Sequence, residues 1–170
     1  MNFRILAAAI LTLTAVSCHT GRHEPDLAGI GVAVQAERFD GDLFAISPDS
    51  IYYSLPYLRT RYGAFFDLFC RRIIRVPATS DSMLAVNLGH FVRDPDVAEV
   101  RQACSKEFSS VTAIEEELSQ SFRYYKYHFP EKYVPRLVMF ISGFNYTVVS
   151  ADSMLGVGLD MYLGENSKFY

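Results

Sequence analysis

The residue with the most specific chemical signal is Cys18, which follows the small residues Ala15-Val16-Ser17. Arg4 and an apolar run from Ile5 to Val16 precede it, as in bacterial export signals. A thiol in this place accepts diacylglycerol in lipoprotein precursors, so residues 1–17 are predicted to be a signal peptide and Cys18 to be lipidated. Two or three acyl chains, such as palmitate, anchor a protein stably to a membrane. The alternative is an ordinary secreted protein with a chance cysteine at the cleavage point.

Zinc chemistry would require an H-E-x-x-H pattern or three protein ligands around an open position. His23-Glu24 lacks the second histidine of that pattern. His90 and Asp94 lie four residues apart on a predicted helix, where a surface or capping role is the plainer interpretation. His128 lies at a helix end, where an imidazole interacts well with free carbonyls. With no evident Ser-His-Asp or Cys-His set, the sequence predicts no enzyme, no metal site and no cofactor.

Three other polar residues are candidates for contact with a ligand or a partner. Asp160 alternates with Gly156 and Gly158 on a predicted strand, and glycines allow another backbone or a ligand to approach closely. The plainer interpretation of Asp160 is a polar outer strand face. Arg38 and Asp40 flank Phe39, and they either contact a partner or pair with each other to anchor the preceding segment.

Length and composition limit the class of protein. The chain has 170 residues, half of them apolar, which is room for one core. Its net charge is −3, and a nucleic-acid-binding protein would require a basic stripe instead. Residues 18–35, which contain several glycines and Pro25, are predicted to be a tether, and residues 36–170 to be the folded domain.

The first part of this domain has helical periodicity. A long helix is predicted from Ser47-Pro48 to about Ile74, because its apolar residues recur at spacings of three and four. Shorter helices are predicted at 79–92 and 96–108. A further helix is predicted from Thr112, where Thr112 and Glu115 have the spacing of a capping box, to a point before Pro130. Cys70 and Cys104 lie in these helices, where they could either form a disulfide or remain buried thiols.

The last part of the domain has the composition of strands. Residues 137–141 and 144–149 are apolar, aromatic or β-branched, with a turn at Ser142-Gly143, and residues 155–163 alternate strictly. The fold class is therefore α+β, with N-terminal helices followed by a short antiparallel sheet. The sheet is predicted to be truncated at its C-terminal edge, because no helix follows to cover its far face. We expect such an uncovered strand to make the isolated chain self-associate.

Three segments together resemble one family. They are Arg38-Phe39-Asp40 with Asp42-Leu43-Phe44, Ile141-Ser142-Gly143-Phe144-Asn145-Tyr146, and the segment from Leu155 to Gly164. The chain resembles the N-terminal part of the gliding-motility lipoprotein GldB family. That family is typical of Bacteroidota and is linked to gliding motility and to type IX secretion.

The resemblance implies a membrane-anchored lipoprotein of the cell envelope that faces the periplasm. Its partners would be the membrane, through the lipid anchor, and envelope proteins of the gliding or secretion machinery, with no nucleic acid. One alternative is a lipid-anchored zinc-peptidase-like hydrolase whose catalytic part is missing from this chain, because the family is distantly similar to such domains. Another is a ligand-binding cleft formed by the aromatic-rich helices.

Overall fold

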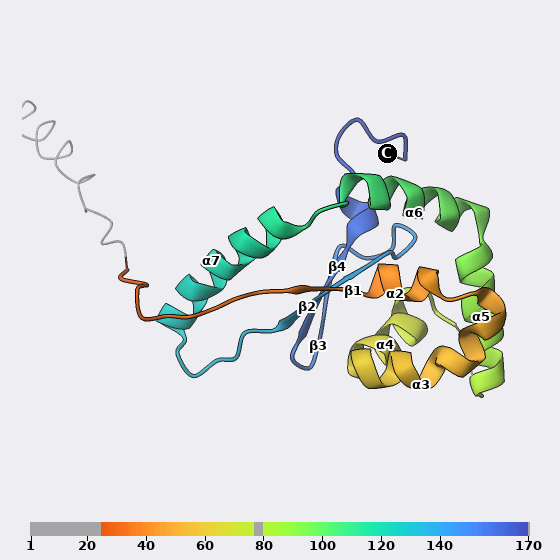
Figure 1. The fold of residues 1–170 in the computed structure, drawn as a ribbon, viewed down its shortest axis with the longest axis horizontal. Helices are drawn as coiled ribbons and strands as arrows, with labels where there is room; N and C mark the ends of the chain where they lie inside the picture. Colours follow the sequence, from red (N-terminus) through yellow and green to blue (C-terminus); the bar gives the residue numbers. More distant parts are fainter. Residues whose placement is uncertain (1–24, 77–79, 170) are drawn as a thin grey trace, which may run out of the picture.

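The computed structural model describes residues 25–76 and 80–169, so Cys18 and its leader lie outside the described residues. Helices lie on both faces of a small central sheet (Figure 1). The α+β class predicted from the sequence is confirmed. Among the described residues, no helix is both long enough and apolar enough to cross a bilayer.

The sheet has four strands in the order β1-β2-β4-β3. They are β1 (Ala36–Arg38), β2 (Arg136–Phe140), β3 (Val148–Ala151) and β4 (Met154–Gly158). β1 is parallel to β2 and β2 is parallel to β4, while β3 and β4 are antiparallel. The expected antiparallel sheet is therefore wrong for two of the three pairings. β1 has only three residues, so it shows no detectable alternation, and it pairs with residues about 100 positions later. β2 pairs with β4 and not with β3, the next strand in the sequence, which makes the second pairing parallel.

The helical elements mostly follow the predicted ones. They are α2 (Phe39–Ala45), α3 (Ile51–Tyr62), α4 (Ala64–Leu68), α5 (Asp81–Arg93), α6 (Pro95–Glu107) and α7 (Thr112–His128). Three short turns of other helix types are η1 (Pro48–Ser50), η2 (Phe69–Ile73) and η3 (Leu159–Tyr162). The Ser80 side chain caps α5, and Pro95 occupies the first turn of α6, where its missing N–H costs nothing.

The predicted helix from Ser47 to Ile74 is broken into several pieces. Gly63 lies between α3 and α4 with φ +50°, a conformation that side-chain-bearing residues rarely adopt. The chain changes direction there without interrupting the apolar periodicity, so the pattern alone did not reveal the break. The break lets Tyr62 and Phe65 pack around the same ring, that of Phe39.

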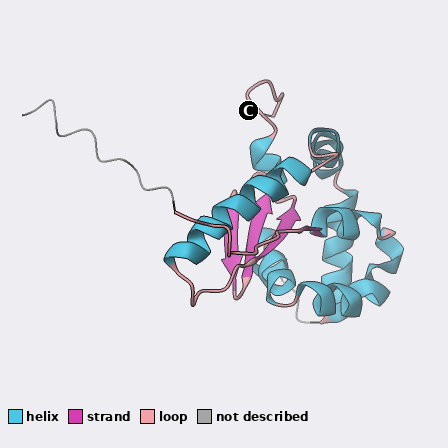
Figure 2. Ribbon diagram, turned by 60° about the vertical axis from the view of Figure 1, so that its left-hand side comes forward, coloured by secondary structure: helices cyan, strands magenta, loops and turns pink. Residues whose placement is uncertain are grey.

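The predicted capping box at the start of α7 does not form. Val111 is the N-cap residue, and no side chain caps the helix. Glu115 instead uses Oε1 to accept a hydrogen bond of 2.7 Å from the Ala36 N–H. Two residues earlier in the chain, the Val34 N–H donates to Ser119 Oγ at 2.8 Å. The last residues of the segment predicted to be a tether therefore lie along α7, as Figure 2 also shows.

Alternate residues of the strands belong to two hydrophobic clusters. Val138 and Phe140 of β2 face the cluster built on α3, α4 and η2. Leu137 and Met139 face the other cluster, to which α6 and α7 contribute. The expectation that no helix covers the far face of the sheet is therefore wrong, because α7 lies across it (Figure 2). Cys70 and Cys104 are buried free thiols, one in each cluster.

Candidate functional site

The three polar residues singled out in the sequence lie at or just after the carboxyl ends of parallel strands. Arg38 ends β1 and Asp40 follows it, while Asp160 lies in η3 just after β4. This edge is where α/β sheets commonly bind ligands. Residues 155–163 were expected to form one strand, but β4 ends at Gly158. Asp160 therefore lies on a helical turn instead of sharing a strand face with the two glycines.

Arg38 and Asp40 form a bidentate ion pair. Arg38 Nε and Nη2 donate to the two carboxylate oxygens of Asp40 at 2.9 and 2.7 Å. Arg38 Nη1 donates to the Phe108 carbonyl at 2.9 Å, which joins β1 to the end of α6. The hydrogen bonds to Asp40 raise the pKa of Arg38 above its ordinary value, against the opposing effect of burial. Asp40 is itself buried, so the pair acts inside the fold as an anchor.

Asp160 is fully buried and holds the loop that follows β2. Its Oδ1 accepts a hydrogen bond from the Ser142 N–H at 3.0 Å. Its Oδ2 accepts bonds from Ser142 Oγ at 2.9 Å and from the Phe144 N–H at 2.5 Å. Ser142 Oγ in turn accepts from the N–H groups of Asn145 and Tyr146. One carboxylate thus organises the turn predicted at Ser142-Gly143.

The close backbone approach expected at the glycines is present at Gly158. A Cβ atom added there would lie 2.1 Å from the Tyr146 carbonyl oxygen, well inside any real contact. The Gly158 N–H also donates to the Thr147 carbonyl at 2.8 Å. The strand predicted from Phe144 begins only at Val148, because residues 141–147 form this irregular loop across the end of β4. The approaching group is therefore the chain's own backbone.

The charges of Asp160, Asp40 and Arg38 all act on the buried thiol of Cys104. Burial raises the pKa of its thiol to about 12, the carboxylates of Asp160 and Asp40 add to the rise, and Arg38 opposes it. Each buried side-chain nitrogen and oxygen among the described residues has a hydrogen-bond partner. The donors and acceptors at the strand ends are therefore already paired within the fold, which fits a structural role. We call Asp160 with its partners Ser142 and Phe144 the clasp.

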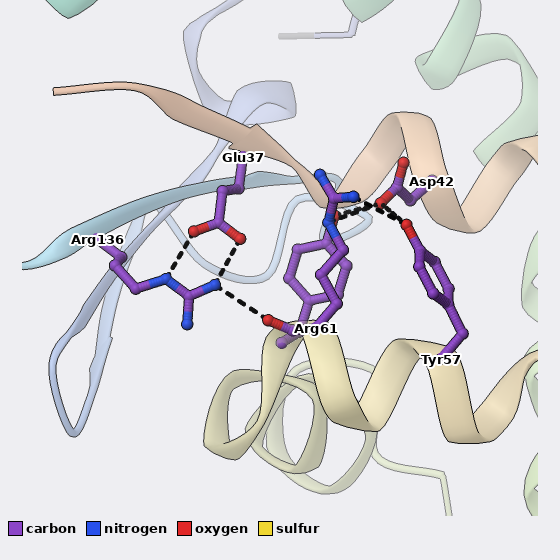
Figure 3. Close-up of polar contacts among 6 residues, drawn as sticks. Glu37, Asp42, Tyr57, Arg61 and Arg136 are labelled. Carbon is purple, nitrogen blue, oxygen red and sulfur yellow. Dashed lines mark hydrogen bonds and ion pairs between the residues drawn. The ribbon is translucent and has the colours of Figure 1, made fainter.

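A second polar network, not identified from the sequence, connects α3 to the first two strands (Figure 3). Arg136 of β2 donates to both oxygens of Glu37 at 2.7 Å, and its Nη2 also donates to the Arg61 carbonyl at 3.0 Å. Asp42 Oδ2 accepts from the hydroxyls of Tyr57 at 3.0 Å and Tyr62 at 2.7 Å.

Contacts of the Arg61 guanidinium complete this network between α3 and α2. Arg61 Nε lies 3.2 Å from Asp42 Oδ2, and its Nη1 donates to the Tyr57 hydroxyl at 2.9 Å. Burial, followed by the hydrogen bond to Asp42, raises the pKa of the Tyr62 phenol. The only sequence signal was that Asp42 belongs to one of the three family-like segments. Its partners come from other elements, so spacing could not have identified them.

The histidine candidates are not brought together. Asp94 Oδ1 caps α6 by accepting from the N–H groups of Asp96 and Val97. His90 lines a shallow surface pocket that Asp49 and Arg93 also line, and His128 packs edge-to-face on Tyr127 at 5.1 Å. Within residues 25–76 and 80–169, no three His, Cys, Asp or Glu side chains are grouped as metal ligands would be. His23-Glu24 lies outside the described residues.

An apolar groove lies between α7 and the sheet. It has a volume of about 410 Å³. Ile114 and Leu118 form its helix side, and Leu155 and Val157 of β4 form its floor. α7 contributes no fully buried residue, so its apolar stripe covers the sheet only in part. Part of the apolar surface of the sheet therefore remains accessible along this helix.

The fold and these clusters define an α+β domain in which Asp160 joins the end of β4 to the loop after β2, while the Arg38–Asp40 pair joins the end of β1 to α6. The family model described as gliding motility protein GldB matches residues 20–170. The chain belongs to this family, which confirms the resemblance seen in the three segments. No curated protein and no solved structure matches the chain.

The structure explains why those three segments stand out. The second and third meet where Asp160 binds Ser142 and where Gly158 contacts Tyr146. The first contains the Arg38–Asp40 pair and Phe39, whose ring lies at the centre of the aromatic cluster. The second and third segments therefore build one structural junction, and the first contributes the central ring of the aromatic core.

Proposed function

We propose that this protein is a cell-envelope lipoprotein, anchored through Cys18, that supports gliding motility or type IX secretion through contacts with other envelope proteins. The observation that carries the proposal is the family match, which begins at residue 20, directly after the predicted lipidation site. The anchor would hold the domain on the periplasmic side of a membrane. The domain would then act by binding rather than by catalysis.

The chemistry of the described polar residues supports a binding role. A catalytic group must be free to exchange protons or to contact a substrate. Asp160 and Asp40 are instead buried in hydrogen bonds that hold loops and strands. Both carboxylates are thus suited to fixing the shape of a surface.

The exposed apolar side chains support protein contacts. Tyr52, Met83 and Val86 are exposed on α3 and α5, and Tyr52 and Val86 line one shallow pocket. The groove beneath α7 exposes further apolar surface at the other side of the sheet. Aromatic residues and methionine are enriched at protein interfaces, and clustered apolar residues on a surface commonly mark one.

The anchor is tested by Cys18→Ala, with Cys104→Ala as the matched loss of a thiol. Metabolic labelling with a palmitate analogue and membrane fractionation are the measurements. Cys18→Ala is expected to lose the label and most of its membrane retention. A protein without acyl chains binds the membrane far more weakly than one anchored by two or three of them. Cys104→Ala should keep both, since its thiol is buried. Label on Cys18→Ala equal to that on the unaltered chain would contradict the anchor.

The role in motility is tested by complementation. A gliding host without its own gene of this family receives either the unaltered chain or Cys18→Ala. The unaltered chain should restore spreading and secretion of surface proteins, whereas Cys18→Ala should not, because the domain would no longer be held beside its partners. Failure of the unaltered, membrane-retained chain to restore either activity would contradict the proposed role while leaving the anchor intact.

A further inference from the structure

The end of the molecule where the described chain begins carries a group of exposed aromatic residues. Tyr124 and Tyr127 on α7 are 37% and 47% exposed, and Phe129 and Tyr133 just after the helix are 49% and 61% exposed. Tyrosine and tryptophan rings favour the boundary between lipid and water, because they have an apolar body and a polar tip. We call these four residues, Tyr124, Tyr127, Phe129 and Tyr133, the aromatic end.

The aromatic end is held in place by hydrogen bonds. Lys126 Nζ donates to the carbonyl oxygens of Pro130 and Lys132, which ties the loop after α7 back to the helix. The Tyr133 hydroxyl donates to the Asp152 carbonyl at 2.9 Å, which ties the same loop to the turn between β3 and β4. The loop that carries Phe129 and Tyr133 is therefore already ordered when it meets another surface, and less entropy is lost on contact.

The charges at this end balance, so no excess of negative charge opposes contact with a lipid surface. Arg123, Lys126 and Lys132 are basic, while Glu131 is the acidic residue of the same stretch, in a chain whose net charge is −3. Asp26 and Asp152 are the nearby acids on other segments. Together with Glu131, these acids offset the three basic residues, so the contact with lipid depends on the aromatic rings.

The route of the chain places the start of the described residues beside this end of α7. The segment from Leu27 to Gln35 runs antiparallel to α7, so Leu27 lies beside Arg123 near the C-terminal end of the helix. Figures 1 and 2 both show the described chain entering there, far from α3 and α5. Cys18 is seven residues before Pro25, and that length of chain spans at most about 25 Å.

We propose that the aromatic end rests in the headgroup region of the bilayer that holds the Cys18 lipid, so that α3 and α5 point away from the membrane. The inference rests on the anchor in the proposed function. A short tether gives the aromatic end a high effective concentration at the lipid surface, so even a weak contact is populated. The exposed apolar residues of α3 and α5 are then presented to envelope partners.

The chain contains no tryptophan, which permits a direct test with single-tryptophan variants. Tyr127→Trp places the probe at the aromatic end, and Tyr53→Trp places a matched probe on α3, where Tyr53 is 81% exposed. Both are made in the lipidated full chain and reconstituted into vesicles of phosphatidylethanolamine and phosphatidylglycerol. Flotation with the vesicles is measured first, followed by quenching with brominated lipids.

We expect emission from Tyr127→Trp to shift to the blue and to be quenched about twofold, because an indole at the interface reaches the acyl chains. Emission from Tyr53→Trp should be the same in vesicles with and without brominated lipid. Tyr124→Trp, one turn earlier on the same face, should repeat the result for Tyr127→Trp. A protein that floats with the vesicles but shows equal emission from the two probes overturns this inference alone. A protein that does not float overturns the anchor and the inference together.

Discussion

The two faces of the sheet are covered very differently. On the face toward α3 and α4, the Phe39 ring packs edge-to-face against Tyr62 at 4.8 Å and against Phe69 at 4.7 Å, and all three residues are fully buried. On the other face, α7 contributes no fully buried residue and leaves the groove of about 410 Å³. One face is a dense aromatic core, and the other is a partly open apolar surface.

The comparison separates the source of stability from the place where apolar surface remains available. Burial of apolar area supplies most of the free energy of folding, so the first face carries more of it. A helix held only by a half-buried stripe can move or exchange partners at a smaller cost. We therefore expect substitutions on the two faces to differ in their effect on the free energy of unfolding.

The largest expected effect comes from Phe39→Ala. Removal of a fully buried ring that touches several others should lower the free energy of unfolding by about 3–5 kcal/mol. Leu118→Ala, in the half-buried stripe of α7, should lower it by about 1 kcal/mol or less. Urea unfolding of both variants, followed by circular dichroism, is the measurement. Equal losses would show that α7 is as firmly packed as the aromatic core.

The next effect concerns the clasp at the strand ends. Asp160→Ala leaves the N–H groups of Ser142 and Phe144 without their acceptor, at a cost of about 2–4 kcal/mol in the free energy of unfolding. The control is Asp49→Ala, which removes an exposed ion pair with Arg93 and should cost less than about 1 kcal/mol. Thermal melts of the two variants are the measurement. A loss for Asp160→Ala no greater than that for Asp49→Ala would contradict the structural role of the carboxylate.

Local patterns predicted the elements but not their partners. The helical periodicity of residues 96–108 and of the segment from Thr112 depends on neighbouring residues, and both helices form where expected. The parallel pairing of β1 with β2 connects residues about 100 positions apart, which no short-range pattern records. The end of β4 at Gly158 was also missed, because the alternation continues into η3 and only contact with Tyr146 ends the strand.

The candidate site was predicted only in part, again because contacts between distant residues leave no short-range pattern. Asp160, Arg38 and Asp40 were identified from their sequence context, and the structure places them at one edge of the sheet. The charges of Asp160 and Arg38 are used inside the fold because they bind Ser142 and Phe108. These two partners come from distant segments of the chain, so the sequence context did not reveal them. The network around Asp42 was missed because its partners lie on α3. A role of the three residues in contact with a ligand or partner stays a prediction.

A pH dependence is expected from the two thiols, one in each cluster. Burial is the main cause that raises the pKa of both Cys70 and Cys104 from 9.0 to about 12. Below pH 9 the thiols are protonated in both the folded and the unfolded protein, so their contribution to the free energy of unfolding is fully present. As the pH rises toward 12, the unfolded thiol ionises first and the stabilisation is lost, at about 1.4 kcal/mol per pH unit for each thiol.

The comparison of the two faces is sharpened by removing one thiol at a time. Cys70→Ala and Cys104→Ala should each flatten the dependence of the unfolding free energy on pH by about 1.4 kcal/mol per unit above pH 9. Urea unfolding over a series of alkaline buffers measures the slopes. Tyr62 also has a raised pKa, but it contributes equally to both variants. A smaller change for Cys104→Ala would show that water reaches the α7 face.

The smallest expected effect tests how the entering chain is fastened to α7. Ser119 Oγ accepts the Val34 N–H and itself donates to the Glu115 carbonyl at 2.6 Å. Ser119→Ala removes this acceptor from a part-buried N–H, which should lower the free energy of unfolding by about 1 kcal/mol. Ser121→Ala on the same helix, at the mouth of the groove, is the matched control and should change it by about 0.5 kcal/mol at most.

Hydrogen exchange at the Val34 amide gives this last prediction a local measurement. In the unaltered chain the amide is protected by its bond to Ser119, and Val34 is nearly buried. In Ser119→Ala its exchange should accelerate while the amides of β2 keep their rates, because β2 is held from both sides by β1 and β4. If β2 exchange accelerated equally, α7 and the sheet would open as one unit. The two faces would then be a single cooperative structure, despite the difference in their packing.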